Sequence, residues 1–298
     1  MGAKHFFENE IITEGSGSDV KYYVNIDKIE VESKNEFRFT VAKIIAEENL
    51  GYVNEHDFPA QPRESSYSKY GKRLLDIIFS SIALIITSPV NLALAICTFF
   101  DVGRPIIFSQ SRTGKNMIPF TIIKFRNMTN DTDENGELLP ASMRVTKFGR
   151  FVRKTSLDEL LNFWSILKGD MSIIGPRPLP GGYLDRFSAR HMARHAVRPG
   201  LECPVITGGA LRPSWGEQFE NDVYYAENVS LKLDLQMCIA LIRMVFDKDS
   251  RKMRGNSNRG TFLGYSKDGH SIATHKVPVD YVIKAEERLG LSKAMNEE

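Results

Sequence analysis

The chain has 298 residues, of which 42% are hydrophobic, and a formal net charge of +2. It is therefore long enough to bury a sizeable hydrophobic core in one or two domains, which excludes a peptide too short to form such a core. Its three cysteines, Cys97, Cys203 and Cys238, are odd in number and form no Cys-x-x-Cys or Cys/His pattern. This argues against a zinc site and fits a reducing, cytosol-facing environment. The N-terminal stretch also lacks the basic start and apolar run of a cleaved secretory signal.

Charge is polarised along the chain. Residues 1–66 hold seven Lys and Arg against thirteen Asp and Glu, a net charge of −6. Residues 104–200 hold sixteen against eight, a net charge of +8. A basic middle attracts nucleic acid, anionic lipid headgroups and phosphorylated substrates alike, so charge alone does not choose among them.

Residues 1–66 predict a small acidic appended module of unknown role. A partly alternating pattern favours a strand within residues 22–31, and an amphipathic pattern favours a helix over residues 37–51 that ends at Gly51. A linker rich in Pro and Ser, residues 59–71, closes this module.

The stretch from 74 to 100 is apolar and carries one charged residue, Asp76. As a straight helix it would be about 40 Å long, against about 30 Å for the hydrocarbon core of a bilayer. We therefore expect residues 67–103 to lie in a membrane. A single tilted span is the simpler interpretation. However, Ser88 and Pro89 sit at the middle of the stretch, where proline favours a break, and basic residues flank both ends. A re-entrant helix–break–helix hairpin explains this symmetry and a single span does not.

The basic middle predicts short strands over residues 105–114 and 119–128, and a pair of helices over residues 144–168. Residues 182–198 read as one helix, with Arg186, Arg190 and Arg194 on one face, best explained as a solvated or headgroup-facing stripe. The polar C-terminal extension, residues 249–298, predicts a short helix over residues 278–290.

Asp158 and Glu159 stand at the expected start of the second helix. Ser156 and Glu159 match a capping box, which is a sufficient structural reason for an acid there. The apolar residues 157, 160, 161, 164 and 167 predict the buried stripe, and they leave Asp158 on another face. A position that stabilises an acid also keeps it ionised, as a carboxylate nucleophile must be, so the structural and the functional interpretations overlap.

Basic side chains surround this acidic pair in sequence. Arg153 lies on the preceding turn, and Arg177 lies between two prolines that restrict its backbone. A fixed guanidinium suits bidentate binding of a phosphate, although a structural arginine tied to carbonyl groups explains the pattern equally well. Arg198 precedes a Pro-Gly helix exit and could reach back toward a substrate.

Five stretches of the sequence together resemble the bacterial sugar transferase family, the monotopic phosphoglycosyl transferases. They are "GRPIIFSQSRTG", "FTIIKFRNM", "RVTKFGRFVRKTSLDELLNFWSILKGDMSIIGPRPL", "RHAVRPG" and "DVYYAENVSLKLDL", and they keep the family's order and spacing over about residues 69–248. The resemblance implies a re-entrant membrane helix broken at Ser88 and Pro89. It also implies a catalytic domain, residues 104–248, on the cytoplasmic face of a bacterial inner membrane.

The family's reaction moves a sugar-1-phosphate from a UDP-sugar to a polyprenyl phosphate, such as undecaprenyl phosphate, and so initiates assembly of a surface glycan. By resemblance, Asp158 is the nucleophile that forms an aspartyl phosphosugar, and Glu159 helps to bind Mg²⁺, so both acids are candidate metal ligands. Arg153, Arg177 and Arg198 match the family's basic positions near the phosphates. The resemblance implies membrane lipid as a partner and no nucleic acid, and it leaves a homo-oligomer open.

The sequence departs from the family pattern after the Pro-Gly exit, where residues 201–215 replace the usual run, so the sugar stays open. The expected fold class is α/β and mostly helical: a re-entrant membrane hairpin beneath a catalytic domain of amphipathic helices and a few short strands. Two rival functions remain from the residues alone. One is a non-catalytic basic adaptor at a membrane surface, and the other is a single-span metal-dependent phosphohydrolase.

Overall fold

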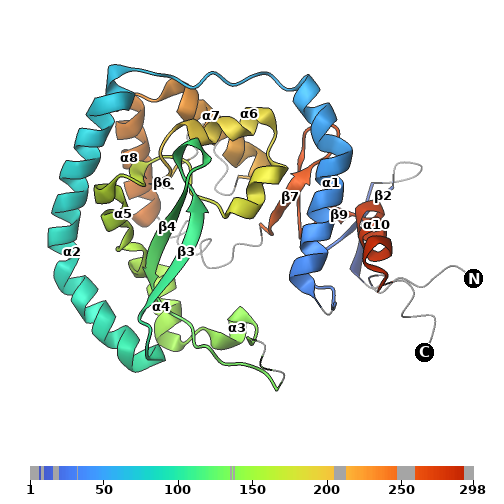
Figure 1. Ribbon diagram of the computed structural model, residues 1–298, viewed down its shortest axis with the longest axis horizontal. Coiled ribbons are helices and arrows are strands. Elements are labelled where there is room, and N and C mark those ends of the chain that lie inside the picture. The colour runs from blue at the N-terminus through green and yellow to red at the C-terminus, as the bar shows by residue number, and fades with distance from the viewer. Residues whose placement is uncertain are drawn as a thin grey trace, which may run out of the picture.

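The computed structural model describes residues 10–15, 20–31, 33–134, 138–204, 213–246 and 259–291, together with Phe7 and Gly136. The chain forms two packed units (Figure 1). The terminal unit, on the right of the view, is built from both ends of the chain, and the central unit, residues 67–246, lies on the left.

The terminal unit mixes short strands with two helices. From the N-terminal segment come β1 (Ile11–Glu14), β2 (Lys21–Val24) and α1 (Lys34–His56). From the C-terminal segment come β7 (Phe262–Tyr265), β8 (Ser271–Ala273), β9 (Val277–Pro278) and α10 (Val279–Leu289). The strands β1, β2 and β9 form an antiparallel sheet in that order, and β7 pairs with β8.

The acidic N-terminal module and the polar C-terminal extension are therefore one folded unit, not two separate segments. Val24 of β2 pairs with Val277 of β9, and both are fully buried. They share a core with Ile45 of α1 and with Val282 and Ala285 of α10. The predicted C-terminal helix is confirmed as α10, but the helix expected to end at Gly51 continues to His56.

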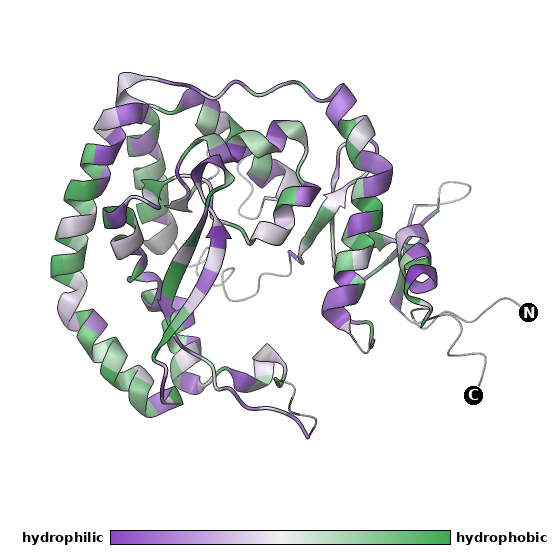
Figure 2. Cartoon of the chain, viewed as in Figure 1, coloured by the Kyte–Doolittle hydropathy of each residue, from purple (hydrophilic) through white to green (hydrophobic). Residues whose placement is uncertain are grey.

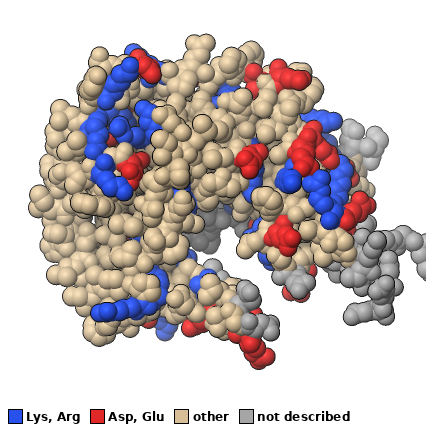
Figure 3. All heavy atoms as spheres, viewed as in Figure 1, with Lys and Arg blue, Asp and Glu red and all other residues tan. Residues whose placement is uncertain are grey.

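The long apolar stretch forms one helix. A five-residue π-helical turn, η3 (Tyr67–Gly71), leads into α2 (Lys72–Val102), and this is the one helix in the described part of the chain that is long and apolar enough to cross a membrane. Figure 2 shows it as a largely hydrophobic ribbon, and Figure 3 shows mostly uncharged atoms along the edge of the molecule that it forms. Only 11% of the most apolar stretch of this helix is buried, so α2 is not a core helix.

The expected interruption at Ser88 and Pro89 is wrong, because α2 stays helical through Pro89. Proline has no N–H to donate to the carbonyl four residues earlier, that of Ile85. The Ser88 hydroxyl donates to this Ile85 oxygen instead, over 2.7 Å. The serine thus satisfies the carbonyl that the proline leaves free, and α2 bends along its path without ending (Figure 1).

Both ends of α2 are held by the central unit while its middle is free. The buried residues of α2 lie near its two ends, and none of residues 81–93 is buried. At the start, Lys72 forms a buried ion pair with Asp234 at 2.8 Å, and Asp76 accepts a hydrogen bond from Ser172 at 2.9 Å. At the end, Asp101 accepts a hydrogen bond from Thr146 at 2.6 Å.

The central unit contains an antiparallel hairpin, a parallel pair of short strands and several helices. In chain order after α2 they are β3 (Ile107–Thr113), η4 (Lys115–Met117), β4 (Pro119–Phe125), α3 (Ala141–Arg144), α4 (Lys147–Thr155), η5 (Leu157–Glu159), α5 (Asn162–Lys168), β5 (Ser172–Ile174), η6 (Gly181–Arg186), α6 (Ala189–Met192), η7 (Ala193–Ala196), β6 (Gly200–Glu202), α7 (Trp215–Asn228) and α8 (Leu231–Phe246). The predicted strands are confirmed as β3 and β4, and the predicted helix pair as α4 and α5. The single helix expected over residues 182–198 is wrong, because the chain there makes three short helical turns, η6, α6 and η7.

The two units pack against each other through an aromatic cluster. Val53 of α1, Phe262 of β7 and Tyr265 of β7 meet Phe187 and Phe219 of the central unit, and all five are buried. The Phe219 and Phe262 rings pack edge to face with centroids 5.0 Å apart. Of the divergent segment, residues 205–212 lie outside the described residues, as do residues 249–258 of the C-terminal extension.

Candidate active site

Asp158 is placed by a sharp change of direction after α4. Ser156 ends α4 in the left-handed conformation, with φ of 56°, and the short turn η5 follows. This turn points the Asp158 carboxylate inward, and the residue is only 7% exposed. The Asn127 amide donates to Asp158 Oδ2 over 3.3 Å.

The expected capping box is absent. The predicted buried stripe is confirmed in part, because Leu157, Leu160 and Leu161 pack against Leu94, Phe125 and Val152. The Ser156 side chain makes no capping hydrogen bond, because Ser156 itself closes the preceding helix. Asn162 and Ser165 are 4% and 2% exposed, on the face that Asp158 shares, whereas Trp164 of the apolar stripe is 53% exposed. The carboxylate of Asp158 therefore belongs to the packed side of this segment.

Glu159 is held by two cations. Its Oε1 accepts from Lys124 Nζ at 2.6 Å and from Arg177 Nη2 at 2.8 Å. Lys124 comes from β4, and Arg177 follows β5, so two elements far apart in the sequence meet on one carboxylate oxygen. Arg177 Nη1 also lies 3.5 Å from Glu202 Oε2 at the end of β6.

The pKa values of the two acids are shifted in opposite directions. Burial raises the pKa of Asp158, and the positive charge of Lys124 only partly opposes this effect. Burial also acts to raise the pKa of Glu159, but Arg177 and Lys124 outweigh it and lower that pKa to about 2. Glu159 is thus a fixed anion, whereas Asp158 is an acid whose ionisation depends on its surroundings.

The backbone approaches closely where the basic side chains are positioned. A Cβ atom on Gly175 would lie 2.4 Å from the Arg198 oxygen, and one on Gly200 would lie 2.2 Å from the Gly175 nitrogen. Only glycine fits at these two positions, which lets β5 and β6 lie side by side just before Arg177. Arg194 then donates to the Arg177 carbonyl oxygen at 2.9 Å.

Arg194 is a buried structural residue, which corrects its expected place in a solvated stripe. Its guanidinium is 3% exposed and pairs at 2.8 Å with Asp222, which is 0% exposed. Arg190 pairs with Glu220, and Arg186 donates to the Phe262 carbonyl. The three arginines do not share a helix face, because the segment is not one helix.

Arg153 acts on the acidic pair through Asn127. Its Nε donates to Asn127 Oδ1 at 2.9 Å, and the amide of the same asparagine contacts Asp158. Gly149 lets the backbone of Asn127 pass close to α4, because a Cβ atom on Gly149 would lie 2.1 Å from the backbone carbonyl oxygen of Asn127. Arg153 therefore orients the hydrogen-bond partner of Asp158.

Arg198 is not brought to the acidic pair. Its Nε donates to the Gly169 carbonyl at 3.0 Å, at the end of α5. Arg73 of α2 donates to the carbonyls of Ile166 and Leu167 at the same helix end, each over 2.6 Å. Two arginines thus cap the exposed carbonyls of α5 and tie this helix to the start of α2.

Three residues of the site carried no assigned role in the sequence: Lys124, Asn127 and Arg112. Lys124 and Arg112 lie on the paired strands β4 and β3, and the charge of Glu159 acts on Arg112. An isolated cation on a short strand has no helical or heptad pattern around it, so only its departure from the apolar run "FTII" could have marked Lys124.

The described residues contain no group of three or more His, Cys, Asp or Glu side chains that could hold a metal ion. The acidic pair nevertheless fits Mg²⁺, which binds through one or two carboxylates and completes its shell with substrate phosphates and water. Lys124 and Arg177 occupy Glu159 Oε1, and no described residue donates to Oε2. Glu159 Oε2 and the Asp158 carboxylate are therefore the oxygens that remain to bind the metal ion.

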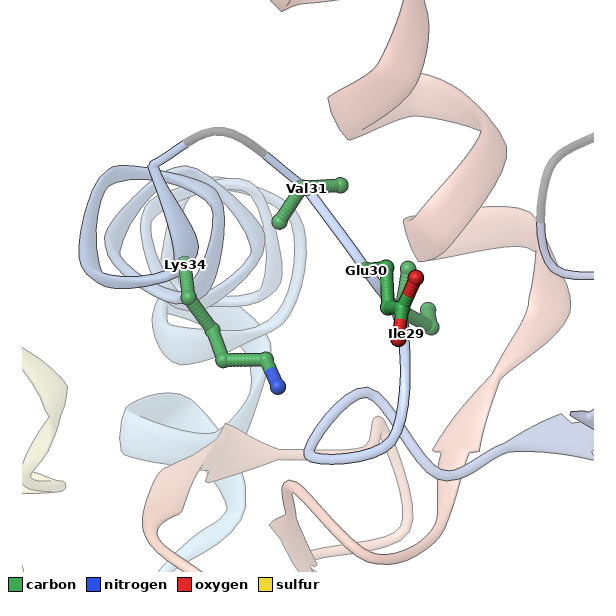
Figure 4. A pocket seen from close by; sticks show the side chains of 4 residues that line it. All are labelled: Ile29, Glu30, Val31 and Lys34. Carbon is green, nitrogen blue, oxygen red and sulfur yellow. The ribbon is translucent and has the colours of Figure 1, made fainter. Parts of the chain in front are cut away.

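A shallow hollow lies elsewhere, in the terminal unit. Ile29, Glu30, Val31 and Lys34 line it, where the loop before α1 meets the start of that helix (Figure 4). It contains none of the side chains that contact Asp158 or Glu159, so the acidic pair is the better candidate for the active site.

Comparison with known proteins identifies a family over the central unit. The family model of the bacterial sugar transferases matches residues 67–248, which include all of the residues that contact the acidic pair. The chain therefore belongs to the bacterial sugar transferase family. The terminal unit lies outside the matched residues.

Three relatives illustrate the similarity. A protein of Bacillus subtilis (strain 168) named as an uncharacterized sugar transferase, EpsL, is 37% identical over 193 residues, which are 65% of this chain and 96% of that protein. A UDP-N-acetylgalactosamine-undecaprenyl-phosphate N-acetylgalactosaminephosphotransferase of Aeromonas hydrophila is 38% identical over 58% of this chain and 43% of its own. A UDP-glucose:undecaprenyl-phosphate glucose-1-phosphate transferase of Klebsiella pneumoniae is 38% identical over 56% of this chain and 38% of its own. The match thus spans less than half the length of the last two proteins.

Proposed function

We propose that this protein transfers a sugar-1-phosphate from a UDP-sugar to a polyprenyl phosphate in a bacterial membrane. One observation carries the proposal above the others: a buried carboxylate, Asp158, adjoins an anion that Lys124 and Arg177 hold in place. This arrangement lies within the residues that match the family, and relatives are named for this reaction.

The proposed reaction is a double displacement. An oxygen of the Asp158 carboxylate attacks the sugar-bearing phosphorus of the donor, the bond from that phosphorus to the bridging oxygen breaks, and UMP leaves with the electron pair. A phosphate oxygen of the polyprenyl phosphate then attacks the same phosphorus. The acyl phosphate bond breaks, Asp158 returns as a carboxylate, and the product is a polyprenyl diphosphate sugar.

The surrounding residues serve this chemistry by position and charge. Arg153 fixes Asn127, and Asn127 in turn orients the attacking carboxylate. Arg177 presents a guanidinium that is 47% exposed, and it can bind a donor phosphate while it stays paired with Glu159. Mg²⁺ held by Asp158 and Glu159 would offset the charge of the diphosphate. Arg198 was expected to bind phosphate from its resemblance to the family's basic positions, but in this structure it caps α5.

The way in which α2 is held supports a re-entrant insertion with the catalytic unit on the cytoplasmic side. Lys72 at its start and Asp101 at its end are both tied to the same folded unit, by 2.8 Å and 2.6 Å contacts. A span with its ends on opposite sides of a bilayer would require this polar unit to follow it through the hydrocarbon. The exposed apolar middle of α2 is the part left to enter the lipid.

A UMP-release screen tests the proposal. The purified chain in detergent is incubated with Mg²⁺, undecaprenyl phosphate and each of several UDP-sugars, and UMP is measured. We expect UMP release with one or a few of these donors. Release of more than one UMP per protein molecule should require the acceptor, undecaprenyl phosphate. Release of free phosphate without any polyprenol would favour the phosphohydrolase, and lipid binding with no UMP from any donor would favour the adaptor.

A further inference from the structure

The segment before β7 brings a charged residue from outside the family match into contact with the central unit. The Arg259 guanidinium lies over the Trp215 ring, 3.9 Å from its centre, and Arg259 Nη2 donates to the Ser214 carbonyl at 2.8 Å. The Trp215 indole donates in turn to the Gly260 carbonyl at 3.2 Å. These contacts hold Arg259 against the start of α7.

The charge of Arg259 is incompletely compensated. Arg259 Nε is buried and has no hydrogen-bond partner among the described residues, and none of their carboxylates lies within ion-pair distance of the side chain. Burial lowers the pKa of Arg259, and the more distant Asp222 and Glu202 oppose this only in part. A buried donor without a partner is costly, so the site favours an anion that would accept from it.

A line of basic and aromatic side chains connects Arg259 with the acidic pair. The Tyr183 ring lies with its centroid 6.0 Å from that of the Trp215 ring. The Tyr183 hydroxyl interacts with Thr261, and the positive charges of Arg112 and Arg259 both act on it. Arg112 repeats the pattern of Arg259, because its Nε is also buried without a partner among the described residues. Arg112 Nη1 donates to the carbonyl oxygen of Pro178 over 3.5 Å, and the preceding residue, Arg177, donates to Glu159 at 2.8 Å.

This line runs away from the membrane helix. In Figure 1, α2 forms the left edge of the molecule and β7 lies on the far side of the central unit. A polyprenyl phosphate must come from the lipid around α2, whereas a nucleotide comes from water. The basic and aromatic line therefore suits the donor better than the acceptor.

Building on the proposed function, we propose that this line is the donor nucleotide subsite and that Arg259 binds the phosphate of the UMP half of the donor. Arg112 and Arg177 would then face the sugar-bearing phosphate next to Asp158, and the base would lie beside Tyr183. The terminal unit thus completes the site by supplying a residue that the family region lacks.

The test compares R259Q and R259K with R288Q in the full-length chain. Arg288 is a matched control, because it is an arginine of the same unit whose ion pair with Glu47 at 2.9 Å lies on the surface. A lost charge-assisted hydrogen bond to phosphate should raise both the donor KM and the dissociation constant of UDP about tenfold or more in R259Q. We expect kcat and the KM for undecaprenyl phosphate to change little, because ground-state and transition-state binding fall together. R259K should recover part of the affinity, and R288Q should match the unaltered chain.

The outcomes separate the two proposals. If the unaltered chain binds UDP and releases UMP while R259Q does the same with unchanged constants, Arg259 is not part of the subsite. If R259Q does not fold, R259K provides the test, since Lys lacks the planar fork of Arg. A UDP affinity of R259K equal to that of the unaltered chain would then overturn the assignment. An unaltered chain that neither binds UDP nor releases UMP from any donor contradicts the proposed function itself.

Discussion

Arg177 donates to Glu159 Oε1 over 2.8 Å, and this contact makes the pKa of Glu159 differ from that of its neighbour Asp158. Together with Lys124, it keeps Glu159 ionised, with a pKa of about 2. The neighbouring Asp158 is buried, has no direct partner among the cations of the described residues, and has a raised pKa. Two adjacent carboxylates therefore have different properties: the pKa of Glu159 is lowered and that of Asp158 is raised.

Lys124→Gln should move the acid limb of the pH profile to higher pH. Lys124 lowers the pKa of Asp158 against the larger, opposing effect of burial, so its loss raises that pKa further. The ionised, nucleophilic fraction of Asp158 then falls at any given acidic pH. The measurement is kcat/KM for the donor against pH, with Lys115→Gln on the exposed turn η4 as the control. An acid limb that stays in place or moves to lower pH would show that Asp158 is not the titrating group.

Asp234→Ala should destabilise the protein by about 3 kcal/mol, because it leaves a buried lysine without its partner. Asp234 accepts from Tyr67, Lys72 and Tyr225, and the side chains of the ion pair are 8% and 11% exposed. Urea unfolding in detergent measures the free energy. The double change Lys72→Met with Asp234→Leu removes the charge problem and should recover most of the loss. Equal stability of the single and double variants would contradict the account of how α2 is anchored.

Both flanks of α2 should be labelled from the cytoplasmic side. The test places one cysteine at a time in a chain whose three native cysteines are replaced, at Tyr70, which is 75% exposed, or at Arg104 beyond the helix end. A membrane-impermeant maleimide should modify both positions in inside-out vesicles and neither in right-side-out vesicles. Labelling of the two positions from opposite sides would establish a single span.

Val282→Asp should unfold α1 as well as α10, although the two helices lie more than two hundred residues apart in the chain. Val282 is 0% exposed in the core that the two ends of the chain share, and an unpaired buried charge costs several kcal/mol. Hydrogen exchange should show loss of protection in residues 34–56 and unchanged protection in α5. Lys284→Gln, on the exposed face of the same helix, is the control. Retained protection of α1 would mean that the two segments fold independently.

Local elements could be predicted from the sequence where the pattern and the environment agree. The strands β3 and β4, the helix α10 and the position of the acidic pair needed only short-range information. The joining of the two ends did not follow from it, because a core shared by Val24 and Val277 depends on contacts between distant segments and on a strand of two residues. Each segment indicated an apolar face without indicating what covers it.

The exposure of Trp164 and the burial of the polar side chains near Asp158 have a different cause. In a water-soluble domain an apolar stripe faces the core, so Trp164 was assigned to the interior. In a membrane-associated family part of an apolar face can be exposed. Here Leu157, Leu160 and Leu161 pack inward and Trp164 does not, while the polar face with Asn162 and Ser165 is buried as well. Periodicity cannot distinguish a core from a lipid surface. Similarly, proline predicted a break in α2, and the compensating hydrogen bond from Ser88 to Ile85 became evident only in the structure.

Intact-protein and peptide mass spectrometry of a single turnover tests the central claim most directly. The chain is incubated with its UDP-sugar and Mg²⁺ but without polyprenyl phosphate, quenched in acid and digested. We predict an added mass of one sugar-1-phosphate on the peptide that contains Asp158, its loss on addition of undecaprenyl phosphate, and neither adduct nor turnover in Asp158→Asn. An adduct on another residue, or substantial turnover by Asp158→Asn, would contradict the account.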